Sequence, residues 1–177
     1  MIQRYTLDTN CIIDLEENRP DSVYLKKLIA DHAVKKIDLA VVAISASENQ
    51  LDGKPAWNYS IFEEKLRNTG LDHLEQLLPM AYWDVAFWDH AMGDGDRTLE
   101  QSIHDILFPG EPIEKPQEVG FPEKKWRNHK CDVQVAWSHI YHCRDILVTR
   151  DKNFHDNAEK LKAVGLKGVI RPSAYAP

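Results

Sequence analysis

The stretch that decides the fold is Tyr5-Thr6-Leu7-Asp8-Thr9-Asn10, in which a short apolar run leads directly into an acid. A second stretch near the other end of the chain, Ile146-Leu147-Val148-Thr149-Arg150-Asp151, repeats this pattern. Brief apolar runs that end in polar residues are typical of buried strands. Ligands of open α/β sheets bind just beyond the carboxyl ends of the strands. We therefore expect the two acids, Asp8 and Asp151, to face a common pocket.

Between these stretches, apolar strands alternate with amphipathic helices. Residues 37–43 form a continuous apolar, β-branched run, as in a strand that is buried on both faces. The same periodicity predicts short strands at residues 4–7, 146–149 and 168–170, and helices at 11–15, 22–32, 59–68, 71–78, 97–108, 132–143 and 157–164. Alternating strands and helices predict parallel βαβ units, and hence an α/β fold with a doubly wound sheet.

The length of 177 residues predicts a single domain, residues 1–177, with a long insertion-like region at about 52–128. This region is acidic, since residues 84–118 carry nine acids against Arg97 and Lys115. Its residues 81–88 fit a strand or a helix equally well, and residues 109–122 predict an irregular connection rich in proline and glycine.

Cysteine content and hydropathy indicate the compartment. The three cysteines, an odd number without framework spacing, favour buried thiols in a reducing environment. The first residues lack an apolar signal core, and the longest apolar run, residues 39–44, is too short to span a bilayer. We therefore expect a cytoplasmic protein without a membrane segment.

Charge is distributed unevenly along the chain. The net charge of -6 argues against indiscriminate nucleic-acid binding. Residues 121–152 nevertheless carry seven bases and four acids, and they include Asp132 and Asp151. Two interpretations stay open for the cluster Lys124, Lys125, Arg127 and Lys130: a cationic rim for a phosphodiester, or a solvated approach to a helix.

Two further acids have the spacing to join the first pair. Glu48 follows the strand at 37–43, although it stands three residues after Ser45 and would equally suit a capping box. Asp132 opens a predicted helix. Four converging carboxylates cannot stay ionised together without a cation, and hard oxygen ligands suit Mg²⁺ or Mn²⁺. Asn10 and Thr149 would support the ligands or a bound water.

These residues resemble the PIN-domain family of metal-dependent nucleases, particularly its toxin-like ribonucleases. The resemblance rests on Leu7-Asp8-Thr9-Asn10, Ser45-Ala46-Ser47-Glu48, Asp132 and the stretch from Leu147 to Phe154, and its anchors cover residues 4–51 and 128–171. It implies a three-layer sandwich with a central parallel β-sheet flanked by helices, a Mg²⁺ or Mn²⁺ site and cleavage of single-stranded RNA. The acids carried over are Asp8, Glu48, Asp132 and Asp151, with Asn10 and Thr149 as polar support.

The resemblance leaves partners open. Many members of the family pair with an antitoxin, but others do not, and either an antitoxin, another protein or a second copy in a homodimer fits the sequence. The RNA contacts that we predict are Arg127, Lys130 and Arg150. The region between Glu48 and Asp132 is longer and more acidic than in compact members of the family.

Three other interpretations compete with the nuclease. His139, His142 and Cys143 have a helical spacing that zinc ligands could use, but no fourth ligand accompanies them. A haloacid-dehalogenase-like phosphatase also begins with a strand and an acid, but its second acid would stand where this chain has Asn10. A catalytically silent RNA- or protein-binding module is the main alternative, because fold does not fix function.

Overall fold

A five-stranded, all-parallel sheet forms the centre of the computed structural model, which describes residues 2–47, 59–81, 91–93, 95–115 and 123–175. The strand order is β3-β2-β1-β4-β5. The strands are β1 (Gln3–Leu7), β2 (Ile37–Val42), β3 (Glu75–Leu77), β4 (Ile146–Val148) and β5 (Val169–Ile170). Because every pairing is parallel, the predicted α/β class is confirmed.

The register of β1 determines what lies at the carboxyl edge of the sheet. Leu7, the last residue of β1, pairs with Val41 on one side and with Val148 on the other. The amide of Asp8 continues this pairing, since it donates to the carbonyl oxygen of Val148 at 3.1 Å. The residues that follow β1 and β4 are therefore neighbours, as expected from the order of the motifs.

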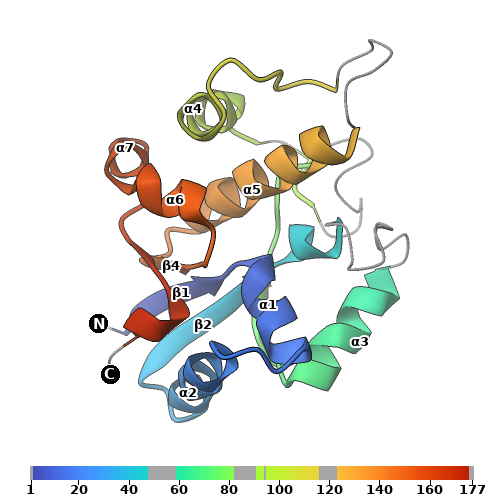
Figure 1. Ribbon diagram of the computed structural model, residues 1–177, viewed down its shortest axis with the longest axis vertical. Helices are drawn as coiled ribbons and strands as arrows, with labels where there is room; N and C mark the ends of the chain where they lie inside the picture. The colour runs from blue at the N-terminus through green and yellow to red at the C-terminus, as the bar shows by residue number, and fades with distance from the viewer. Residues whose placement is uncertain (1, 48–58, 82–90, 94, 116–122, 176–177) are drawn as a thin grey trace.

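Helices cover both faces of the sheet, which gives the expected three layers (Figure 1). One face carries α1 (Thr9–Glu16), α2 (Ser22–Ala33) and α3 (Tyr59–Thr69), and the other carries α4 (Arg97–Leu107), α5 (Glu123–Tyr141), α6 (Lys152–Asp156) and α7 (Ala158–Ala163). Alternate residues of β2 enter the two cores. Leu39 and Val41 join the core under α1 to α3, whereas Ala40 and Val42 join the core under α5. This double burial explains the continuous apolar run of β2.

Helix α5 begins well before the predicted residue 132. The basic run that starts at Lys124 is its first two turns, so the interpretation of these residues as an approach to a helix was wrong. Trp126, Lys130, Val133 and Trp137 are all buried, and their spacing follows one helical face. The sequence did not reveal this buried face, because the charged Lys130 occupies one of its positions. Helical periodicity predicts an apolar residue there.

Two other local predictions were wrong. The segment 71–78 contains strand β3 instead of a helix, because residues 75–77 pair with β2 from Ala40 to Val42. Its leucines have a helical spacing, but the pairing with β2 overrides it. Ser45 lies inside the 3-10 helix η1 (Ala43–Ser47), not before a helix. Glu48, residues 82–88 and residues 116–122 lie outside the described residues.

No helix in the described ranges is long and apolar enough to cross a membrane. The chain ends its described part with a second 3-10 helix, η3 (Pro172–Ala174), which packs beside α2. There Tyr175 donates a 2.8 Å hydrogen bond to the carboxylate of Asp31.

Arg144 ties three strands together near the amino edge of the sheet. Its Nη2 donates to the carbonyl oxygens of Tyr5 in β1, at 2.7 Å, and of Asp38 in β2, at 2.9 Å. Its Nη1 pairs with the carboxylates of Asp38, at 2.7 Å, and Glu75 in β3, at 3.4 Å. The Arg144 side chain is only 2% exposed, whereas the carboxylates of Asp38 and Glu75 reach solvent.

We predict that Arg144→Met lowers the free energy of unfolding by about 2–4 kcal/mol, because two strand carbonyls lose their charged donor in a buried setting. Urea unfolding at pH 7 measures the change, and Arg67→Met, which replaces an exposed arginine of α3, is the matched control. A loss no larger than that of the control would show that Arg144 does not hold the strands together.

Candidate functional site: two carboxylates at the carboxyl edge

Asp8 and Asp151 stand at the start of two helices that leave the same edge of the sheet. Asp8 is the N-cap of α1 and accepts from the Thr9 amide through Oδ1 at 2.7 Å. Asp151 is the N-cap of α6 and accepts from the Asn153 amide through Oδ1 at 2.8 Å. Capping therefore uses one oxygen of each acid. The second oxygen of Asp8 accepts from Thr149 at 2.6 Å and from Asn10.

Asn10 and Thr149 connect the Asp8 carboxylate to the backbone after β4. The Thr149 hydroxyl donates to Asp8 Oδ2 at 2.6 Å and accepts from the Asp151 amide at 2.9 Å. The Asn10 amide nitrogen donates to Asp8 Oδ2 and, at 2.9 Å, to the Thr149 hydroxyl. Its carbonyl oxygen accepts from the Arg150 amide at 3.1 Å. The network fixes the rotamer of Asp8 and joins α1 to the turn after β4.

The surroundings of the Asp8 carboxyl disfavour its ionised form. Burial raises its pKa from 3.8 to about 6, and the negative charge of Asp151 acts in the same direction. The hydrogen bonds from Thr149, Thr9 and Asn10 favour the ionised form but do not outweigh burial. At neutral pH the pocket thus contains a buried anion beside a second anion, an arrangement that a bound cation would relieve.

The other two predicted acids are not part of the described pair. Asp132 was expected in a first helical turn but lies in the middle of α5, half-buried, because α5 begins nine residues earlier. Glu48 is outside the described residues. Within the residues that the structure describes, no three acids, histidines or cysteines form a group that could hold a metal. The described part of the site is therefore a pair of carboxylates.

The prediction that Lys130 contacts RNA was wrong. Its ammonium lies between α5 and α4, 2.9 Å from Glu100 Oε1, and both side chains are 1% exposed. Gln134 donates to the same oxygen at 3.1 Å. Burial lowers the pKa of Lys130, while Glu100 opposes this change. The ion pair holds two helices together, and the ammonium does not face solvent.

Arg127 and Arg150, the other predicted RNA contacts, differ from each other in exposure. The Arg127 side chain is 11% exposed and lies 3.4 Å from Glu123 on the same helix, so little of its guanidinium faces solvent. The Arg150 side chain is 33% exposed, and its Nε lies 2.5 Å from Asp14 Oδ2. Of the three predicted cations, Arg150 is the one that the structure places next to the carboxylate pair with a partly exposed side chain.

Asp14 is a site residue that we did not predict. It lies one helical turn after Asn10 on α1, is fully buried, and is paired with Arg150 and, at 3.5 Å, with Arg19. Burial raises its pKa, and the two arginines counteract this effect. The sequence did contain a sign of this residue, namely an acid inside the otherwise apolar run from residue 11 to 15. An acid in such a position is buried, and a buried acid needs a cationic partner.

The zinc interpretation is not supported by the positions of its residues. His139 is buried and its Nδ1 lies 3.0 Å from the Thr6 hydroxyl, whereas His142 Nε2 lies 3.2 Å from the Leu78 carbonyl oxygen. Burial lowers the pKa of His139 to about 3, which keeps the ring neutral. Cys143 is exposed, contrary to the expectation of buried thiols, while Cys11 and Cys131 are buried.

The donors of the pair fit a small, hard cation. Mg²⁺ is commonly bound through one or two carboxylates and keeps several waters, so two acids at one edge suffice to anchor it. Asp151 would bind it through Oδ2, because its Oδ1 caps α6, whereas both oxygens of Asp8 accept hydrogen bonds and one of them would be shared with the cation. Mn²⁺ accepts the same oxygen ligands.

No protein-family model matches this chain, and comparisons with curated proteins and with solved structures found no match. The resemblance to PIN-domain nucleases therefore rests on the residues themselves.

The raised pKa of Asp8 predicts a pH-dependent penalty in the metal-free protein. The folded state keeps this proton up to about pH 6, whereas the unfolded chain loses it near 3.8. Stability therefore falls as pH rises between these values, by at most about 3 kcal/mol, and stays lower above pH 6. Asp8→Asn lacks this titration, so the melting temperature of the variant minus that of the wild type should increase from pH 4.5 to 7.5. Thermal unfolding in EDTA measures it, and a difference that does not change with pH would contradict the assignment.

Proposed function

We propose that this protein is a Mg²⁺- or Mn²⁺-dependent endoribonuclease that hydrolyses phosphodiester bonds of single-stranded RNA. The observation that carries the proposal is the buried Asp8 carboxylate, whose pKa is raised partly by Asp151, at the ends of two adjacent parallel strands. A structural acid gains nothing from such a neighbour, whereas a cation site requires one. Perturbed acids in such a position are typical of functional sites.

The residues of the pair have distinct roles in the proposed reaction. Asp8 and Asp151 would hold the cation, the Thr149 hydrogen bond favours the ionised form of Asp8, and Asn10 keeps α1 aligned with the turn after β4. The bound cation supplies an acidified water and stabilises charge on the leaving oxygen of the phosphodiester. Water adds to phosphorus, and one ester oxygen leaves with a proton. This chemistry requires no serine, cysteine or histidine nucleophile.

Glu48 and Asp132 stay in the proposal as further ligands suggested by the resemblance to PIN-domain nucleases. The cytoplasm is the proposed compartment, in keeping with the free thiols of Cys11 and Cys131. An antitoxin or another protein partner, and a homodimer, remain compatible with this function. The alternative function is a catalytically silent module that binds RNA or protein.

We predict that Asp8→Asn and Asp151→Asn each reduce RNA cleavage at least about 100-fold without unfolding the protein. Loss of a residue that merely supports a metal ligand already costs about 10–100-fold, so loss of a ligand costs more. The assay follows a labelled single-stranded RNA in Mn²⁺, Mg²⁺ or EDTA. Asp156→Asn is the matched control, because Asp156 is an exposed acid of α6 that pairs with Lys152.

Three outcomes separate the alternatives. Metal-dependent cleavage that both site variants lose supports the nuclease. Cleavage by Asp8→Asn at the wild-type rate contradicts the assigned site. A wild type that neither cleaves RNA nor gains thermal stability from Mn²⁺ would favour the silent module, because an ion that binds the folded state must raise its melting temperature.

A further inference from the structure

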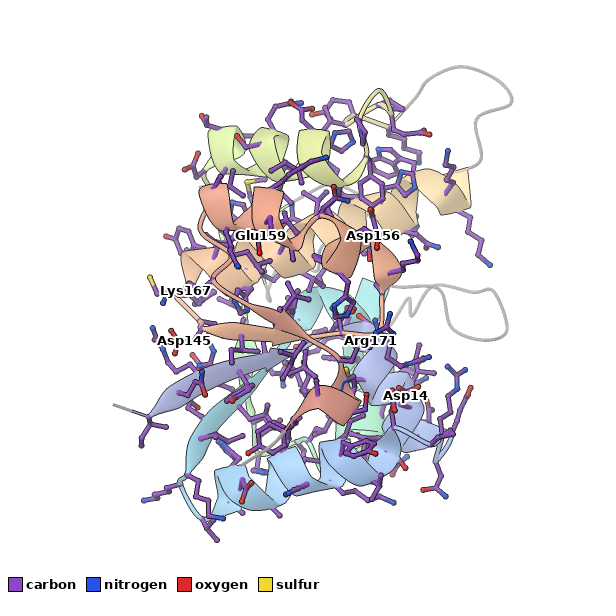
Figure 2. The ribbon with its side chains drawn as sticks, turned by 60° about the vertical axis from the view of Figure 1, so that its left-hand side comes forward. Asp14, Asp145, Asp156, Glu159, Lys167 and Arg171 are labelled. Carbon is purple, nitrogen blue, oxygen red and sulfur yellow. The ribbon has the colours of Figure 1, made fainter. Side chains whose placement is uncertain are left out.

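Three arginines gather beside the carboxylate pair, each from a different part of the chain. Arg19 follows α1, Arg150 follows β4 and Arg171 follows β5. The Asp14 carboxylate lies between two of them, since Oδ2 is 2.5 Å from Arg150 Nε and Oδ1 is 3.5 Å from Arg19 Nη1. Arg171 Nη1 donates to the Arg150 carbonyl oxygen at 3.5 Å. Figure 2 shows Asp14 and Arg171 on the same side of the molecule, opposite Asp145 and Lys167.

The cluster combines three guanidiniums with the acids that pair with them, while Asp21 and the carboxylate pair add negative charge nearby. Its three guanidiniums face two carboxylates, Asp14 and Glu17, of which Glu17 lies 2.5 Å from Arg19 Nε. The side chains of Arg19 and Arg150 are 36% and 33% exposed, and Arg171 is exposed as well. Asp14, by contrast, is fully buried. Asp14 therefore anchors Arg19 and Arg150, whose side chains remain partly exposed to solvent.

The Arg150 side chain is one third exposed and has an acid beside its Nε. It pairs with Asp14 through Nε, and its two terminal nitrogens make no hydrogen bond within the described part of the chain. A guanidinium fixed through one nitrogen loses little further freedom when the remaining donors bind a ligand. The planar pair of donors matches the oxygens of a phosphate, which an ammonium matches less well.

The cluster is also joined to the proposed catalytic pair. The Arg150 amide donates to Asn10 at 3.1 Å, and Asn10 in turn donates to Asp8. Arg150 directly precedes Asp151 in the chain. A strand whose scissile phosphate lies at the two acids would therefore bring an adjoining phosphate to these arginines.

We propose that Arg19, Arg150 and Arg171 form a phosphate-binding subsite, anchored by Asp14, that holds the backbone of single-stranded RNA next to the carboxylate pair. The proposal rests on the proposed ribonuclease function and specifies how its substrate is held. It moves the RNA contacts from α5, where Lys130 is buried in an ion pair, to the segments after α1, β4 and β5. Backbone contacts of this kind give affinity without base preference.

Binding of a fluorescent uridine decamer, measured by anisotropy in EDTA over a range of KCl concentrations, tests the subsite without cleavage. We expect Arg19→Gln, Arg150→Gln and Arg171→Gln each to weaken binding about 3- to 10-fold at low salt, the size of one lost charge-assisted contact. Each lost phosphate contact should also reduce the slope of log K against log salt by about 0.7. Arg150→Lys keeps the positive charge but not the paired donors. Its salt dependence should therefore be closer to that of the wild type than its affinity is.

Lys167→Gln is the matched control, because it removes one positive charge from the opposite side of the molecule, where Lys167 pairs with Asp145 at 2.7 Å (Figure 2). Arg171→Gln is the variant least expected to disturb folding, since Arg171 is exposed and its one hydrogen bond within the described residues is 3.5 Å long. Wild-type affinity and slope in both Arg19→Gln and Arg171→Gln would overturn the subsite.

The assay separates this proposal from the proposed function. If the arginine variants lose RNA binding but the wild type never cleaves RNA, the subsite stands and the nuclease fails. If metal-dependent cleavage is present and all three variants bind RNA as the wild type does, the nuclease stands and the subsite fails.

Discussion

The pairing of Leu7 with Val148 is the constraint on which the site depends. It places β1 and β4 side by side and in register, so the residues after both strands meet at one edge. Asp8 and Asp151 lie about 140 residues apart in the sequence, yet the hydroxyl of Thr149 contacts both residues. A shift of one residue in this register would exchange the faces of β4 and remove Thr149 from Asp8. The buried apolar residues on both faces of the sheet exclude such a shift.

The site contains buried negative charges that are unfavourable for folding, and the rest of the fold offsets this cost. Asp8 is buried beside Asp151, and Asp14 is buried one turn further along α1. The charges of Asp8 and Asp14 are compensated in different ways. Asp14 is neutralised by Arg150 and Arg19, whereas the donors that Asp8 receives from the described residues are all neutral. Thr149 and Asn10 orient the Asp8 carboxylate without cancelling its charge, which is what a cation site needs. Helix α1 and its N-cap thus carry one carboxylate, Asp8, for a metal cation and a second, Asp14, that forms ion pairs with arginines.

The sequence predicted the parts of the site that depend on local patterns. Asp8, Asn10, Thr149 and Asp151 follow directly from strands, and the ends of parallel strands necessarily meet at one edge. The prediction failed where a long helix carried charged residues on its buried face. Lys130 and Glu100 neutralise each other between α4 and α5, so a basic run looked like a surface segment and the start of α5 was missed. Asp132 was misplaced for the same reason. Asp14 was missed because its arginine partners come from distant parts of the chain, which periodicity cannot show.

The most direct measurement of the central claim is paramagnetic broadening of backbone amide signals by substoichiometric Mn²⁺, recorded for the wild type and for Asp8→Asn. The account predicts that the amides of Thr9, Asn10 and Arg150 broaden first in the wild type and remain sharp in the variant. The amides of Asp38 and Lys167, which belong to the opposite edge of the sheet, should remain sharp in both. Broadening centred on other acids, or broadening that Asp8→Asn leaves unchanged, would contradict a cation site formed by Asp8 and Asp151.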